Sequence, residues 1–594
     1  MCNNQKHNRK KFDDIFILVI KSVWEFKKSF CMLTILNAIV KGSLPALLLL
    51  VMQKIINALQ MKNLSFNEVL MMSLLYLIIE ILNTLTDNYF EYYFGKNSKL
   101  FSAKIDETML KKALTFSVKD FENANTYDLI NKAKMQNSQG ILFFFQEIIE
   151  VLKLIVSILS TVSILFLYNI IFAFIVLLIP VIKCIYTIKL NEEQFDAITS
   201  RVKESRKVWY IDYLIMTGNA FKEIIINNIG GFLVNTYSSL RKKFNQEDIK
   251  IQKKLLKNNV YFCIFQNLVI GAIFLYTIYL GFLGELLIGD VSTYTNCIYN
   301  ILASVEACFL GGSNLIQESL YIKLFYDFIN LNVDTNCKED FTDIKIDSIE
   351  IKNLSYKYNG KYVLKSINLK ITSKTPLAIL GKNGSGKTTL IKIIAGLYDD
   401  YEGNVLVNGK ELKTLNKKHY YKHIGCVFQD FVKFETSLRK NIGFGNLSSM
   451  YNDEEIWDVL ESVKLKKVFS DTKDLELSLG SWFGTTQVSL GEWQKIAIAR
   501  SLLKKADVYL LDEPDASLDV LAEKSMLKLY KDLSQNKLTV FVTHKVEQVK
   551  DLTNDIIVLN KGEIVERGNH CDLLKKKGLY SDLYYKIDMV LEYK

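Results

Sequence analysis

Gly381-Lys382-Asn383-Gly384-Ser385-Gly386-Lys387-Thr388 fits the phosphate-binding pattern G-x-x-x-x-G-K-[ST]. The apolar run Leu377–Leu380 precedes this octapeptide, and a helical pattern opens with Thr389. A glycine-rich turn between a strand and a helix lets backbone amides and the helix N-terminus surround phosphate oxygens. The octapeptide therefore predicts a nucleoside triphosphate site, in which Lys387 reaches the β- and γ-phosphates and Thr388 binds Mg²⁺.

A second apolar run, Val508–Leu511, ends in two carboxylates, Asp512 and Glu513. A buried strand holds the groups at its end rigidly, so we expect both side chains beside the phosphates. We assign Asp512 to the Mg²⁺ shell and Glu513 to the base that orients the attacking water. Strands often end in acidic residues, and the position of this pair after a phosphate-binding loop is what makes the assignment specific.

The sequence around these motifs alternates short β-type runs with helical patterns. Two of the expected strands are Ile349–Leu354 and Leu538–Val542. Strands that alternate with helices indicate an α/β domain with a largely parallel sheet. We predict a P-loop nucleotide-hydrolysing domain over 347–594, joined to the preceding sequence by a polar, acidic linker over 330–346.

The first half of the chain has a different composition. Hydrophobic residues make up 49% of the 594 residues, and apolar runs of about 20 residues, long enough to cross a membrane as helices, cluster ahead of the linker. We predict an amphipathic helix within 1–28 that lies on the membrane surface, and an α-helical transmembrane bundle over 29–329. Its six spans are expected at 30–52, 68–90, 143–167, 170–190, 258–282 and 290–311.

The net charge of +10 is distributed unevenly. Lys and Arg gather in the long polar stretches between the second and third and between the fourth and fifth predicted spans, whereas the short breaks at Tyr168–Asn169 and Gly284–Asp290 contain neither. This positive-inside pattern places the long stretches and the α/β domain in the cytoplasm. The sequence has no basic face with interleaved aromatic residues, so we expect no nucleic-acid partner.

In this order the motifs resemble those of the ATP-binding cassette family, and the resemblance extends over nearly the whole chain. It implies ATP and Mg²⁺ as ligands, with the stretch from Gly381 to Thr389 around the phosphates. The resemblance also implies adenine stacking by Tyr358, contact of Gln429 with Mg²⁺ and water, a γ-phosphate contact of His544, and a place for Asp519 in the loop after the catalytic carboxylates.

The segment Val488-Ser489-Leu490-Gly491-Glu492 matches the signature motif of that family. The resemblance implies a dimer in which the signature of one chain completes the ATP site of the other. Leu490 stands where the family has glycine, and Glu492 stands where it has glutamine. One interpretation is a slow or asymmetric ATPase. The other, which we favour because the catalytic residues are intact, is that Ser489 and Gly491 suffice for contact with phosphate.

Six spans ahead of one cassette resemble the half-transporters that act as exporters. The resemblance implies a type IV exporter fold, a location in the cell membrane, and a homodimer, with a heterodimer as the alternative. Two cytoplasmic coupling helices, which would convert closure of the cassettes into helix motion, are expected near 121–132 and 221–237.

The sequences on either side of the signature, Leu479–Phe483 and Glu492–Arg500, are similar to exporters of lantibiotics and other ribosomally made peptides. We therefore expect an exported peptide as the substrate. A lipid or multidrug exporter and a non-transporting regulatory membrane ATPase are the alternatives. The stretch 1–28 is too short for the cysteine-protease domain of some peptide exporters, so we expect no leader cleavage by this chain.

Charged residues within the predicted spans include Lys41 in the first, Lys183 in the fourth and Glu306 in the sixth. A charge inside a membrane is costly and usually faces a cavity or a partner. We expect Lys41 and Glu306 to line the translocation cavity, where they could pair with each other. The alternative is that either residue lies at a membrane interface.

Overall fold

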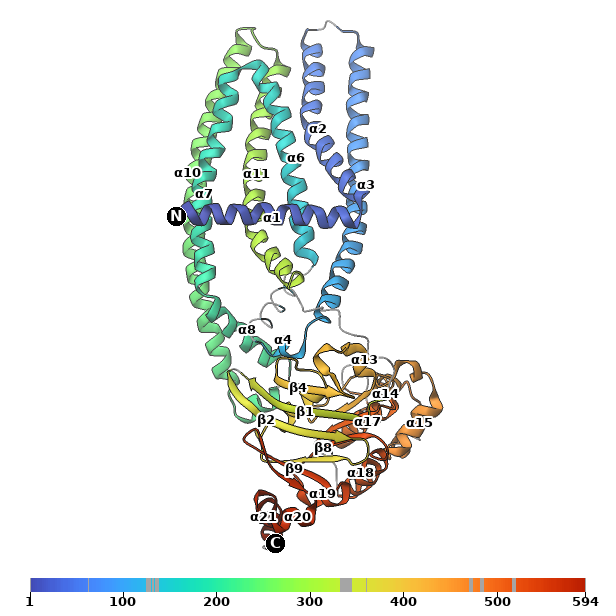
Figure 1. The fold of residues 1–594 in the computed structure, drawn as a ribbon. Coiled ribbons are helices and arrows are strands. Elements are labelled where there is room, and N and C mark those ends of the chain that lie inside the picture. The colour runs from blue at the N-terminus through green and yellow to red at the C-terminus, as the bar shows by residue number, and fades with distance from the viewer. Residues whose placement is uncertain are drawn as a thin grey trace. The chain divides into compact units, whose positions relative to one another are not determined.

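The chain separates into two compact units in the computed structural model (Figure 1). The first comprises Met1–Thr115 and Asn125–Leu331, and the second comprises Phe116–Ala124 and Asn332–Lys594. The structure describes residues 2–61, 64–123, 126, 130, 133, 138–218, 220–331, 345–358, 360–469, 474–480, 486–514 and 520–592. Most of the expected linker, 330–346, lies outside the described residues.

The first unit consists of helices, most of them long (Figure 1). They are α1 (Cys2–Phe26), α2 (Lys28–Met61), α3 (Phe66–Ala113), α6 (Ser138–Tyr168), α7 (Ile170–Ser200), α8 (Val202–Met216), α9 (Phe221–Ile226), α10 (Gly230–Phe282) and α11 (Ile288–Ile329). Among the described residues, five helices are long and apolar enough to cross a membrane: α2, α3, α6, α7 and α10. These five contain the first five predicted spans, whereas the sixth lies in α11, whose apolar character is diluted by Asp290, Glu306 and several hydroxyl and amide side chains.

The two longest helices described in this unit extend far beyond the length that a membrane requires. α3 has 48 residues and α10 has 53, compared with about 20 for a spanning helix. The N-terminus of α3 is fixed by a capping box, in which the Glu68 carboxylate accepts a hydrogen bond from the Ser65 N–H at 2.8 Å. In the described residues, the long polar stretches that follow the second predicted span and precede the fifth are therefore largely helical.

The N-terminal helix α1 packs on the other helices of its unit. Its buried residues Ile15, Val19 and Val23 recur at helical spacing and join an apolar cluster with side chains of α2, α6 and α11. The hydroxyls of Ser22 and Tyr326 lie 2.6 Å apart. The amphipathic helix predicted from the sequence is present, and much of its apolar face is covered by protein.

The second unit contains two sheets. The first is antiparallel with the order β2-β1-β4-β5, and the second has the order β10-β9-β3-β8-β7-β6, in which all pairs are parallel except β9 with β10. The strands are β1 (Ser348–Tyr358), β2 (Lys361–Thr372), β3 (Leu377–Leu380), β4 (Glu402–Val407), β5 (Lys410–Glu411), β6 (Ile424–Val427), β7 (Val508–Asp512), β8 (Leu538–Val542), β9 (Asp555–Asn560) and β10 (Glu563–Gly568). The predicted fold class, a helical membrane-type bundle with an α/β cassette, is confirmed.

Helices surround these sheets. They are α12 (Lys387–Ile394), α13 (Lys417–Lys422), α14 (Leu438–Gly443), α15 (Asp453–Ser462), α16 (Lys466–Phe469), α17 (Leu490–Leu503), α18 (Val520–Leu533), α19 (Val546–Leu552), α20 (His570–Lys575) and α21 (Leu579–Glu592), with 3₁₀ turns at Leu412–Thr414 and Leu447–Ser449. The strands β3, β7 and β8 are buried along their whole length, as expected for a parallel sheet covered on both faces. Their carboxyl ends meet at one edge, where ligands of open α/β sheets bind.

The segment Phe116–Ala124 belongs to the second unit although it follows α3 in the chain. It contains the short helix α4 (Val118–Glu122). Ser117 caps α4, and its N–H donates to the Asp120 carboxylate at 2.8 Å. This segment lies earlier than the coupling helix predicted near 121–132, most of which falls outside the described residues.

Candidate functional site

The octapeptide forms a turn between β3 and α12. Gly384 and Gly386 adopt φ values of +78° and +106°, which favour glycine because side chains clash in this region. A Cβ atom on Gly386 would lie 2.8 Å from the Leu364 Cδ2 and 3.0 Å from the Val363 carbonyl oxygen. These glycines therefore permit both the bend of the loop and its close approach to β2.

Lys387 is the first residue of α12, and its side chain is buried against the loop. Its Nζ donates to the carbonyl oxygens of Gly381 at 2.9 Å and Lys382 at 3.2 Å. Burial lowers the pKa of the Lys387 ammonium, and the nearby negative charges of Asp512 and Glu513 act in the opposite direction. The ammonium is thus held inside the loop, where anionic oxygens would be attracted to it.

Asp512 ends β7 and is almost completely buried. Burial raises the pKa of its carboxyl, and a hydrogen bond with Thr388 opposes that rise. The Asp512 Oδ2 and the Ser385 Oγ are buried without a hydrogen-bond partner among the described residues. Buried oxygens without partners, next to a threonine hydroxyl, fit the hard oxygen ligands that Mg²⁺ prefers.

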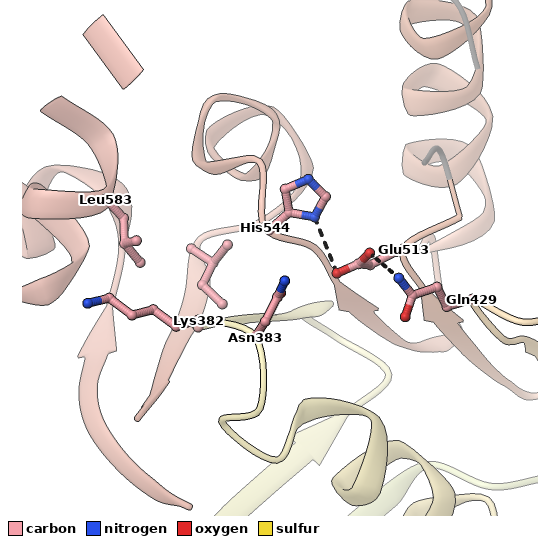
Figure 2. Close-up of a pocket in the computed structure, with 8 residues that line it drawn as sticks. Lys382, Asn383, Gln429, Glu513, His544 and Leu583 are labelled. Atoms are coloured by element: carbon pink, nitrogen blue, oxygen red, sulfur yellow. Dashed lines mark hydrogen bonds and ion pairs between the residues drawn. The ribbon is translucent and has the colours of Figure 1, made fainter. Parts of the chain in front are cut away.

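Glu513 follows Asp512 and lies between two further predicted residues (Figure 2). Its Oε2 accepts a hydrogen bond from the Gln429 Nε2 at 2.9 Å, and its Oε1 lies 3.2 Å from the His544 Nδ1. The three side chains come from the segments that follow β6, β7 and β8. The fold therefore brings together, around one carboxylate, residues that are far apart in the sequence.

A pocket of about 420 Å³ lies beside these residues. Its lining consists of Leu380, Gly381, Lys382, Asn383, Gln429, Glu513, His544 and Leu583. Leu583 comes from the C-terminal helix α21, and Figure 2 shows it on the same side of the pocket as Lys382. No motif in the sequence points to Leu583. Tyr358 does not belong to this lining; it ends β1 with 42% of its surface exposed.

The signature segment begins α17. Ser489 is the N-cap, and the Glu492 Oε2 accepts hydrogen bonds from both the N–H and the hydroxyl of Ser489 at 2.8 Å. The Glu492 carboxylate therefore turns back onto the N-terminus of its own helix, in the geometry of a capping box. Leu490 is 50% exposed. Asp519, predicted in the loop after the catalytic carboxylates, lies outside the described residues.

The helix α4 contacts the part of the cassette that holds the phosphate loop. Glu122 accepts hydrogen bonds from the Tyr398 hydroxyl at 2.9 Å and lies 3.2 Å from the Lys392 Nζ. Lys392 lies in the last turn of α12, whose first residue is Lys387. A second ion pair joins Lys119 to Asp400. These contacts connect α4 to α12, the helix that begins with Lys387.

The expected pair of Lys41 with Glu306 is wrong. The Lys41 Nζ lies 2.7 Å from the Asp87 carboxylate on α3 and donates to the Thr86 hydroxyl at 2.8 Å. Glu306 instead pairs with Lys183 of α7 at 3.0 Å. Each charge is thus neutralised by a neighbouring helix, and sequence spacing alone does not reveal which helices are neighbours.

Comparison with known proteins identifies the family. Residues 364–516 match the family described as "ABC transporter". Over 570 residues the chain is 32% identical to the subtilin transport ATP-binding protein SpaT of Bacillus subtilis. The alignment covers 95% of this chain and 92% of that protein. The chain belongs to the ABC transporter family. This ABC transporter is also 31% identical over 578 residues to the nisin transport ATP-binding protein NisT of Lactococcus lactis subsp. lactis, covering 95% of each.

The fold of the ABC transporter is similar to a solved structure described as a bacterial Atm1-family ABC exporter with ATP bound. The TM-score is 0.77 at 18% identity, and the similarity covers 93% of this chain and 97% of that one. The family and the apolar helices together show a multi-pass membrane protein that binds ATP and uses its hydrolysis to drive transport.

Proposed function

We propose that this ABC transporter exports a ribosomally made peptide of the lantibiotic class across the cell membrane. The observation that carries the proposal is similarity over 95% of the chain to proteins named for transport of subtilin and nisin. A similarity confined to the cassette would support ATP use alone. This one extends through the helical unit, which a transported substrate must cross.

At the ATP site we assign Lys387 to the β- and γ-phosphates and Tyr358 to the adenine. Thr388, Gln429 and Asp512 would hold Mg²⁺, which when bound neutralises charge on the phosphate oxygens. The buried Asp512 oxygen without a partner supports this assignment.

Hydrolysis requires a water aligned with the γ-phosphate. Glu513 accepts a hydrogen bond from the water and takes its proton as the water oxygen bonds to the γ-phosphorus and the bond from that phosphorus to the bridging oxygen of ADP breaks. Gln429 and His544 fix both oxygens of the Glu513 carboxylate, so the group is aimed before ATP binds. His544 then contacts the γ-phosphate, and its contact with the Glu513 carboxylate links that carboxylate to the bound phosphate.

The active form is a dimer, and the signature of each chain completes the ATP site of its partner. Ser489 lies at the N-terminus of a helix of 14 residues, where the helix dipole and free N–H groups favour an anion. The γ-phosphate of the partner's ATP is that anion. A homodimer satisfies this arrangement with one gene product, and a heterodimer is the alternative.

The cassette faces the cytoplasm, because the basic residues gather on the side of the long polar stretches. We propose the domain limits 1–28, 29–329, 330–346 and 347–594. The helices α4 and α9 act as coupling helices. The contacts of Glu122 with the cassette support this role for α4, and the exposed apolar side chains of Phe221, Ile225 and Ile226 suit α9 to a protein partner.

We propose that Lys41 and Glu306 line the translocation path, each with its own counter-ion. An ion pair lowers the cost of placing charge among apolar helices. The pair of Glu306 with Lys183 joins α7 to α11, and the pair of Lys41 with Asp87 joins α2 to α3. A peptide with charged side chains would exchange partners with these groups as it passes.

Transport into inside-out vesicles tests the proposal. Vesicles that contain the wild-type chain are expected to accumulate a fluorescent lantibiotic precursor when ATP is added, and vesicles with Glu513→Gln are expected to accumulate none. Active ATPase without peptide uptake would contradict peptide export. In that case, movement of a labelled lipid or dye would indicate the lipid or multidrug alternative, and no movement of any of them would indicate a regulatory ATPase.

A further inference from the structure

The turn that carries Glu513 is held from the protein interior by two side chains. Gln494, in the second turn of α17, is 2% exposed, and its Nε2 donates to the Glu513 carbonyl oxygen at 3.3 Å. Tyr530 of α18 donates through its hydroxyl to the next carbonyl oxygen, that of Pro514, at 3.2 Å. Both bonds act on the backbone of the turn and leave the carboxylate free to face the pocket.

The backbone at Glu513 requires such a restraint. Its φ of +48° lies in the left-handed region, which is unfavourable for a residue with a side chain. Its N–H donates to the Val542 carbonyl at 2.9 Å, and its carbonyl accepts from Gln494. Both peptide groups that adjoin Glu513 are therefore fixed. Rotation of either one would turn the carboxylate away from Gln429 and His544.

We infer that Gln494 is a positioning residue for ATP hydrolysis, which aims the Glu513 carboxylate by holding the Glu513 carbonyl. The inference rests on the role proposed above for Glu513. It also has a consequence for the dimer, because Gln494 follows Ser489 by about a turn and a half of the same helix. Through this contact, a phosphate bound at the signature of one chain is coupled to the catalytic carboxylate of that same chain, which belongs to the other ATP site.

Steady-state ATPase kinetics of the full-length, membrane-reconstituted chain test the inference. Gln494→Ala removes the donor, and Gln494→Met keeps the approximate length of the side chain but also lacks the donor. Each variant is expected to lower kcat by about tenfold, because the loss of one buried hydrogen bond leaves the carbonyl unsatisfied and the turn free to move. The KM for ATP is expected to stay within about twofold of wild type, because Gln494 does not line the pocket.

Gln548→Ala is the matched control. Gln548 of α19 is also a buried glutamine, 7% exposed, and its Nε2 has no hydrogen-bond partner among the described residues. Its variant is expected to keep the wild-type kcat, and thermal melting of all three variants detects any general loss of stability. Gln494 variants with wild-type kcat would overturn the inference, as would a rise in KM alone or an equal loss of kcat in Gln548→Ala.

Glu513→Gln, measured in parallel, separates the inference from its premise. If Glu513→Gln hydrolyses ATP at the wild-type rate, the role of Glu513 is wrong and the inference falls with it. If Glu513→Gln is inactive while Gln494→Ala has a normal kcat, the assignment of Gln494 alone is wrong.

Discussion

Two parts of the cassette are proposed to bind ATP: the phosphate loop with its carboxylates, and the signature at the start of α17. They differ in the partners of their polar groups. In the first, the Glu513 carboxylate is held at both oxygens by Gln429 and His544, and the Lys387 ammonium lies on loop carbonyls. In the second, the N–H and hydroxyl of Ser489 are occupied by the carboxylate of Glu492. Neutral side-chain and backbone groups therefore contact Glu513 and Lys387 on the phosphate side, whereas an internal carboxylate contacts Ser489 at the signature.

This difference gives the two parts different requirements. We expect the phosphate loop to bind nucleotide in a single chain, because the residues proposed to contact the phosphates lie within one cassette. In the proposed dimer, the signature would exchange the Glu492 carboxylate for a phosphate oxygen of the partner's ATP, since the N-terminus of a helix favours one negative group or the other. Formation of the ATP-bound dimer is therefore the step at which Glu492 should matter.

Glu513→Gln should have the largest effect, because it removes the proposed general base beside the phosphate loop. We expect kcat to fall by about 1,000-fold, the contribution of a well-placed general base. ATP binding should remain, because the phosphate contacts of Lys387 are untouched. Phosphate release and equilibrium nucleotide binding measure the two quantities separately. A variant that loses ATP binding as well would contradict the separation of binding from chemistry.

Ser489→Ala removes the hydroxyl that the signature is proposed to offer to the partner's ATP. We expect kcat to fall by about 100-fold, the typical cost of removing one donor to a charge that develops in the transition state. Binding of ATP to the phosphate loop of a single chain should be unchanged. The matched control is Ser462→Ala, because Ser462 is an exposed serine whose hydroxyl bonds only the carbonyl of Val459 within its own helix among the described residues. Equal losses in the two variants would argue against a role for the signature.

The sequence predicts the phosphate side more completely than the signature side. The octapeptide and the run that ends at Asp512 and Glu513 are short contiguous motifs, and their meeting follows from parallel strands whose carboxyl ends share an edge. The direction of the Glu492 side chain is not contained in the motif. A glutamate three residues after a serine does predict a capping box, and this signal could have revealed that Glu492 faces Ser489.

Other contacts could not be predicted because they depend on which distant segments pack together. Gln494 reaches Glu513 across the interior, and Leu583 enters the lining of the pocket from the C-terminal helix. Glu306 pairs with Lys183 only because α7 lies beside α11. Such contacts depend on the fold of the whole chain, whereas the five helices that are long and apolar enough to cross a membrane follow from local composition.

Glu122→Gln tests which part of the cassette receives the signal from α4. Its contacts with Lys392 and Tyr398 lie on the phosphate side. We therefore expect the substitution to weaken the coupling of ATP hydrolysis to peptide transport and to leave hydrolysis without peptide largely unchanged. Basal ATPase should stay within about twofold, and peptide-stimulated ATPase should fall by about fivefold, which corresponds to about 1 kcal/mol for a partly buried ion pair. Glu107→Gln, which removes an exposed pair with Lys111 on α3, is the control. Equal effects would contradict the path through α12.

Glu492→Gln should have the smallest effect and should increase the rate. Glutamine can keep the capping-box geometry while it removes the negative charge that competes with phosphate. We expect kcat to rise by about twofold to fivefold, with little change in thermal stability. A fall in kcat would show that the Glu492 carboxylate assists the dimer rather than opposes it, and the comparison between the two parts would need revision.

The central claim is that each ATP site takes its phosphate loop from one chain and its signature from the other. The direct measurement is the ATPase activity of purified mixed dimers, with Glu513→Gln in one copy and Ser489→Ala in the other, compared with dimers that carry both substitutions in one copy beside a wild-type partner. The account predicts the higher activity for the first dimer, because both substitutions then fall in one site and the other site stays intact. Higher activity in the second dimer would place both elements of each site in the same chain and contradict the account.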